Sequence, residues 1–136
     1  MTSELRVDNL KGSTTGGSIN VLGEGTSATT NLQQGLCKAW NNFDNDDAAF
    51  NDSFNFASIT DNGTGQMLMS VTNAFNNNTY THVGGGTHDG GSYVANLYFN
   101  HDTSKTTTQA EFDTRKTNED QLDAEFMSLV YFGDLA

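Results

Sequence analysis

The sequence predicts an all-β protein in which an N-terminal extended arm precedes a small antiparallel β-sandwich of jelly-roll-like type. Only 17% of the residues are charged, whereas Asn, Thr, Ser and 14 Gly are abundant, a composition that favours short strands and turns over helices. About seven short alternating or apolar runs follow one another at intervals of about 10 residues, which is typical of sandwiches and barrels.

Residues 1–34 differ from the rest of the chain and are predicted to form the extended arm. The alternation in residues 4–10 and the short apolar run 19–22 each indicate a brief strand. Two isolated strands of this size bury too little surface to fold alone. We therefore expect the arm to become ordered by pairing with copies of itself or with a partner. The residues assigned to attachment and assembly are Leu5, Val7, Leu10, Ile19, Val21 and Leu22.

Residues 35–136 are predicted to form the sandwich, or knob domain. Its first strand covers residues 37–43 and ends at the acidic turn 44–47, where Asp and Asn favour turn geometry. Trp40 lies among apolar neighbours, so we expect it to anchor the core, with a sugar-stacking platform as the alternative. Cys37 is expected to be a small core side chain.

The middle of the domain is predicted to begin with a strand at residues 52–60. The segment 61–65 contains the pair Asn62-Gly63, and Asn-Gly closes hairpins because both residues readily adopt positive φ. The strand after this turn is expected to direct one set of apolar side chains to a single face: Met67, Met69 and Val71.

Four further segments complete the predicted domain. Strands are expected at residues 80–83, 93–99 and 106–114, and the Gly-rich segment 84–91 between the first two is predicted to be flexible. The last strand, 126–132, is apolar on both of its faces.

The double apolar character of the last strand predicts oligomerisation. One face fills the core of a small domain, and the other then needs a cover from another subunit. The side chains assigned to this oligomer interface are Met127, Leu129 and Tyr131.

Charge and composition exclude several classes of protein. The net charge of −11 and a pI near 4.2 argue against a nucleic-acid partner, because phosphates would be repelled. No apolar run reaches the ~18–20 residues that span a bilayer, so membrane insertion is not expected. No signal peptide is recognised at the N-terminus, and the single Cys37 fits folding in a reducing cytoplasm.

The sequence contains no recognisable catalytic constellation, so we expect neither an enzyme nor a cofactor. The three histidines, His82, His88 and His101, match no metal-ligand spacing, although a histidine on a threefold axis could meet its own copies. The acidic segment 44–55 lacks the Gly and Glu of a calcium loop. We therefore predict no metal site.

Several segments resemble a module of predicted tail-fibre and other virion structural proteins of tailed phages, notably marine ones. These are residues 38–43 (KAWNNF), 52–65 (DSFNFASITDNGTG) and 71–75 (VTNAF), and residues 3–10 and 130–133 are similar to its start and ending. The resemblance implies a non-enzymatic, homotrimeric virion component that is assembled in the bacterial cytoplasm. Its arm would bind other virion proteins or wind with its copies, and its β-domain would form a compact knob.

Two functions follow from this resemblance. The first is a short tail fibre or receptor-binding knob, whose loops at residues 84–92 and 102–107 contact the host surface, through a glycan. The candidates for receptor contact are Tyr80, His82, His88, Tyr93 and Tyr98. The second is a capsid decoration, head-fibre or tail-assembly protein that binds neighbouring virion subunits. A free carbohydrate-binding module or small jelly-roll enzyme is a third possibility, because fold class alone does not establish function.

Overall fold

The computed structural model describes residues 4–22, 29–87, 94–99, 105–116, 118 and 120–136. The chain divides into two compact units, Met1–Leu36 and Cys37–Ala136, which are described separately. The described residues confirm the prediction of an all-β, antiparallel fold. No helix among them is long and apolar enough to cross a membrane.

The first unit contains a two-stranded sheet and one helical turn. Strand β1 (Asn20–Leu22) pairs antiparallel with β2 (Thr29–Asn31), and α1 (Leu32–Gly35) follows directly. The side chain of Asn31 caps this turn by accepting a hydrogen bond from the Gln34 amide at 3.2 Å. The strand expected at residues 4–10 is not formed, and this segment pairs with no strand among the described residues.

The described residues of the second unit form eight strands in the order β4-β3-β10-β7-β8-β9-β6-β5. Within it, β7 to β10 form one Greek key and β6 to β9 form another that overlaps it. Eight strands with Greek keys are the usual arrangement of jelly-roll-like sandwiches. The strands are β3 (Ala39–Asp44), β4 (Ala49–Phe54), β5 (Phe56–Gly63), β6 (Gln66–Val71), β7 (Thr81–Thr87), β8 (Val94–Phe99), β9 (Gln109–Arg115) and β10 (Phe126–Phe132).

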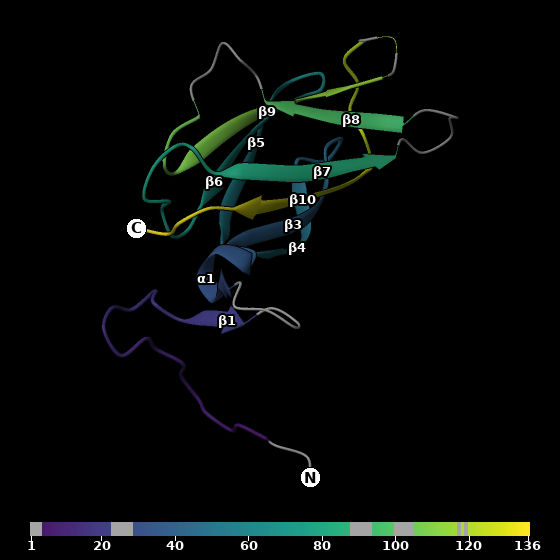
Figure 1. The fold of residues 1–136 in the computed structure, drawn as a ribbon. Coiled ribbons are helices and arrows are strands. Elements are labelled where there is room, and N and C mark those ends of the chain that lie inside the picture. The colour runs from purple at the N-terminus through teal and green to yellow at the C-terminus, as the bar shows by residue number, and fades with distance from the viewer. Residues whose placement is uncertain (1–3, 23–28, 88–93, 100–104, 117, 119) are drawn as a thin grey trace. The chain divides into compact units, whose positions relative to one another are not determined.

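The strand order folds into two halves that enclose the core. We call β4-β3-β10-β7 the β10 sheet and β8-β9-β6-β5 the β6 sheet; β7 and β8 join them through two residue pairs, Gly86↔Ala95 and Thr87↔Val94. Figure 1 shows β7, β10 and β3 side by side, as their pairing requires. Tyr131 of β10 contacts both Phe56 and Phe112 of the β6 sheet, with ring centres 5.2 and 6.1 Å apart.

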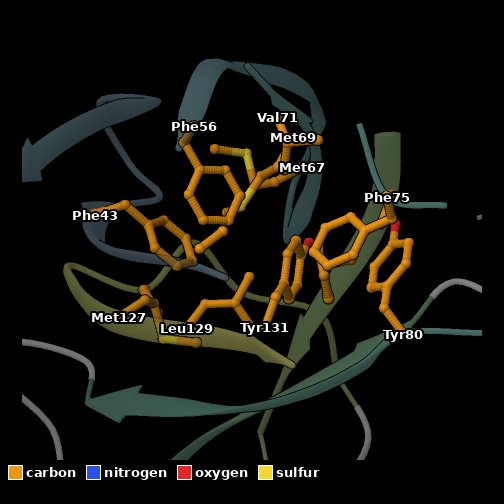
Figure 2. Packing of buried hydrophobic residues seen from close by; sticks show 14 of the residues in the cluster. Phe43, Phe56, Met67, Met69, Val71, Phe75, Tyr80, Met127, Leu129 and Tyr131 are labelled. Atoms are coloured by element: carbon orange, nitrogen blue, oxygen red, sulfur yellow. The ribbon is translucent and has the colours of Figure 1, made fainter. Parts of the chain in front are cut away.

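The face of β10 that fills this core is the opposite of the one expected. The side chains of Met127, Leu129 and Tyr131 are almost wholly buried and belong to the same core cluster as Met67 and Met69 (Figure 2). Their assignment to the oligomer interface is therefore wrong. Both faces of this strand are apolar, and the register with β3 and β7 decides which of them turns inward.

Gly84 and Gly86 belong to strand β7, although the sequence predicts a flexible segment there. They pair with Leu129 and Met127 of β10. A Cβ atom on Gly84 would lie 2.7 Å from the Ser128 carbonyl oxygen, and one on Gly86 would overlap the Phe126 carbonyl oxygen. The glycines therefore permit a close approach of two paired strands, a role that composition alone does not distinguish from flexibility.

The expected strand 52–60 is divided by a corner at Asn55. This residue has φ 61°, a left-handed conformation that Asn tolerates better than most residues, so β4 ends in the β10 sheet and β5 begins in the β6 sheet. The Asn55 side chain secures the corner by donating to the Lys38 carbonyl at 2.9 Å and accepting from the Asn73 amide at 2.8 Å.

The hairpin predicted after this strand is confirmed, but its two turn residues lie two positions later than the predicted pair Asn62-Gly63. Gly63 pairs with Gln66, so Thr64 and Gly65 form the two-residue turn. Gly65 has φ 69°, and Asn62-Gly63 lies at a register shift before the turn. The buried face of β6 carries Met67, Met69 and Val71, as the alternation predicts.

Candidate functional site: the outer face of the β10 sheet

A row of large apolar side chains crosses the face of the β10 sheet that turns away from the core. Phe54 pairs with Trp40, Trp40 with Val130, and Val130 with Val83, so the four residues lie in register on four adjacent strands. Phe54, Trp40 and Val83 are 53%, 38% and 66% exposed, and Val130 is half-buried. We call these four residues the outer row. Strands lie about 4.8 Å apart, so the row is about 14 Å long.

Trp40 lies in the outer row and not in the core, where the sequence analysis placed it. Ala39, Asn41 and Phe43 are the residues of β3 that point inward. Successive side chains of a strand point to opposite faces, so the burial of these three forces Trp40 outward. The strand thus exposes its largest apolar side chain and buries an amide, the reverse of the usual preference.

A second row, made of polar residues, lies beside the outer row. Asp52 pairs with Asn42, Asn42 with Ser128, and Ser128 with Gly85. The Asn42 amide nitrogen donates to the Ser128 hydroxyl at 3.1 Å and to the Met127 carbonyl at 3.2 Å, and its oxygen accepts from the Asn51 amide at 3.1 Å. These groups bond chiefly to one another, so the polar row stabilises the register of the strands.

The outer row is the described feature best suited to association. Phe126, at the other end of β10, is also exposed and lies on the same face. Complete burial of a side chain of this size contributes about 1.5–3 kcal/mol, so covering even part of the row would stabilise a complex substantially. Contiguous apolar surface of this kind is uncommon on monomers and usually marks an interaction site.

Tyr80, predicted to contact a receptor, is buried. It is 4% exposed, and its ring stacks on that of Phe75 with 4.1 Å between ring centres. Its hydroxyl donates to the Gln109 carbonyl at 3.3 Å, and burial raises the pKa of Tyr80 well above its ordinary value. Tyr80 is therefore a core residue, and its proposed role in receptor contact is wrong.

His82 is half-buried against the core. Its ring meets the edge of Phe112, with ring centres 5.4 Å apart. Burial, with a smaller contribution from the charge of Lys105, lowers the pKa of His82. Lys105 donates to the Tyr80 carbonyl at 2.6 Å and lies 4.5 Å from the centre of the Tyr80 ring.

The other receptor candidates are not placed. His88 and Tyr93 lie outside the described residues. Tyr98 belongs to β8, where it pairs with Asp113, but its side chain is not described. Among the five receptor candidates, the structure therefore describes the side chains of Tyr80 and His82 alone.

The acidic turn after β3 is stabilised by hydrogen bonds to the side chain of Asp44. The Asp44 carboxylate accepts from the amides of Asp46 and Asp47 at 2.9 and 3.3 Å, which is the turn geometry that the sequence favours. Within the ranges that the structure describes, no three His, Cys, Asp or Glu side chains are grouped to hold a metal ion.

The arm offers apolar surface of its own. Val21 and Leu22 are exposed on β1, and Ile19 is half-buried. The first unit carries two basic and three acidic residues, a net charge of −1, whereas the second carries four basic and 14 acidic residues, a net charge of −10. Leu5, Val7 and Leu10 are also exposed. The arm thus exposes several apolar side chains and is nearly neutral, whereas the knob is strongly acidic.

Comparison with known proteins adds no relative to these observations. No family model, no curated protein and no solved structure matches the chain.

The sequence signal for the outer row was the doubly apolar last strand, combined with a Trp flanked by Ala39 and Asn41. Pairing across strands was needed to show that Trp40 and Val130 share one face.

Proposed function

We propose that this chain is a non-enzymatic structural protein of a bacteriophage virion, and that it forms a homotrimeric short tail fibre with a receptor-binding knob. The observation that carries the proposal is the outer row on the β10 sheet. The resemblance of residues 38–43 and 52–65 to tail-fibre modules supplies the class of particle.

The outer row supports a subunit interface because it is both large and exposed. Trp and Phe are the residues that most often dominate the binding energy of protein interfaces, and a polar rim usually surrounds them. Trp40 and Phe54 lie beside Asn42, Asn51 and Asp52 in this way. In the proposed assembly the row meets a neighbouring subunit.

The two units would have different roles in such a fibre. The arm would attach the trimer to other virion proteins through the exposed Val21 and Leu22 of β1. The knob would face outward toward a host-surface glycan. In that arrangement the acidic knob needs neutral or cation-bridged contacts at the anionic envelope.

A capsid decoration, head-fibre or tail-assembly role is the second candidate. It is favoured by the position of the outer row, which lies on the flat side of a sheet and not on loops. A flat apolar side suits contact with neighbouring subunits in a lattice.

Purified particles of the phage whose genome encodes this chain test the proposal. We expect quantitative mass spectrometry to find the chain in the particle, and immunogold labelling to place it at the tail in a low copy number that is a multiple of three. A copy number in the hundreds with labelling over the head would favour the decoration role. Absence from purified particles would contradict both.

A further inference from the structure

We propose that the outer row is covered by residues 4–10 of a second copy of this chain, so that neighbouring subunits exchange their N-terminal arms. The inference deepens the proposed function and rests on it, because it assumes association between copies. It assigns one occupant to the exposed face of the β10 sheet.

The arm has the surface that such an exchange needs. Leu5, Val7 and Leu10 are each more than half exposed, and residues 4–10 form neither helix nor strand. Leu5 and Val7 are two positions apart, so an extended chain presents both on one side. Residues 4–10 and the outer row are therefore two segments of one sequence that expose apolar side chains.

The lengths of the two surfaces are compatible. Seven extended residues reach about 23 Å at about 3.3 Å each. The outer row crosses four strands and is about 14 Å long. One arm segment is thus long enough to cover the row from Phe54 to Val83.

Charge favours the arm over a second knob as the occupant. Two knobs facing each other would bring together two net charges of −10, whereas the arm unit carries a net charge of only −1. Asp44 and Asp52 lie on the same face as the outer row, whereas in the arm Arg6 pairs with Glu4 at 2.7 Å. The approach of the arm unit is less opposed by charge than the approach of a second knob.

A glycan is a poorer fit to this face. Sugar sites combine an aromatic platform with polar groups that orient the ligand. Here the Asn42 amide is engaged by Asn51, Ser128 and the Met127 carbonyl, and half of the outer row consists of valines. An aliphatic and aromatic row suits an apolar peptide segment better.

Disulfide trapping between two distinguishable chains tests the exchange. Both chains carry Cys37→Ser; one also carries Val7→Cys, and the other, with a larger tag, carries Val83→Cys. The control partner carries Thr60→Cys, an exposed position on β5 of the β6 sheet. The purified chains are mixed, oxidised and separated by non-reducing electrophoresis, and circular dichroism confirms that each variant is folded.

We expect the Val7→Cys and Val83→Cys chains to form a cross-linked heterodimer at least tenfold more than the Val7→Cys and Thr60→Cys chains. Equal yields for the two partners would overturn the inference, because the arm would have no preferred face. A single chain that carries both Val7→Cys and Val83→Cys provides a further test. If the disulfide forms only within this chain, the inference is overturned, since each arm would then cover its own knob.

The native mass of the wild-type chain separates failure of the inference from failure of the proposed function. A trimer that gives no Val7→Cys to Val83→Cys product would overturn arm exchange and leave the proposed trimer standing. A monomer that is also absent from virions would overturn both. Glycan binding that is abolished by Trp40→Ala, without any trapping, would assign the row to a sugar.

Discussion

Trp40 and Asn41 are neighbours on β3 with their usual environments reversed. Trp40 is 38% exposed on the outer face, whereas Asn41 is 3% exposed and its amide nitrogen lies 3.4 Å from the Met69 sulfur in the core. A strand must place adjacent side chains on opposite faces, so one of the two had to occupy the unfavourable side. Exposure of the Trp40 side chain to water is unfavourable in the isolated chain, and a partner that covers this face would remove that exposure.

Phe54 and Phe56 provide a matched test of the two faces. They flank the corner at Asn55, but Phe54 is exposed and Phe56 is buried against Tyr131. We expect Phe56→Ala to lower the free energy of unfolding by about 3–5 kcal/mol, measured by urea denaturation. Phe54→Ala should change it by less than about 1 kcal/mol in the monomer and should weaken self-association. Equal destabilisation by both variants would show that the faces are misassigned.

Gly84→Ala should destabilise the knob, because the new methyl group would meet the Ser128 carbonyl at 2.7 Å. Overpacking of this kind costs about 1–3 kcal/mol, which thermal unfolding would detect. Gly16→Ala is the control, since nothing lies within 4 Å of its added Cβ. Unchanged stability of Gly84→Ala would support a flexible segment in place of a paired strand.

Tyr131 and Tyr80 should respond differently to removal of the hydroxyl. The Tyr131 hydroxyl is buried and has no hydrogen-bond partner among the described residues, whereas the Tyr80 hydroxyl donates to the Gln109 carbonyl. We expect Tyr131→Phe to leave the free energy of unfolding unchanged or to raise it by up to about 1 kcal/mol, and Tyr80→Phe to lower it by about 1 kcal/mol. A large loss in Tyr131→Phe alone would argue against this packing.

His82 should make the knob less stable as the pH falls. Its pKa in the folded protein is lowered from 6.5 by burial and by Lys105, so the unfolded chain binds a proton more readily than the folded one. The contribution of the neutral imidazole is complete above pH 6.5 and declines below it, until the pH reaches the lowered value. Unfolding at pH 7.5 and 5.5 should therefore differ more in the wild type than in His82→Gln. An identical pH response of the two proteins would contradict this.

Patterns within short segments of the sequence were sufficient to predict much of the fold. Alternation in residues 66–71 correctly indicated the buried Met67 and Met69. The all-β class followed from composition and turn residues.

What the sequence could not provide depends on contacts between distant segments. Both faces of β10 are apolar, so only its pairing with β3 and β7 shows that Met127, Leu129 and Tyr131 are inside. The role of Gly84 depends on a carbonyl 44 residues further along the chain, at Ser128. The outer row likewise joins four strands that no local window contains.

The native mass of the chain, measured by light scattering after size exclusion, tests the central claim that the outer row is an association surface. The account predicts a trimer for the wild type and a folded monomer for the double variant Trp40→Ser, Val83→Ser. Leu36→Ser, which alters an exposed leucine of the first unit, should remain trimeric. A wild type that stays monomeric at high concentration, or a double variant that stays trimeric, would contradict the claim.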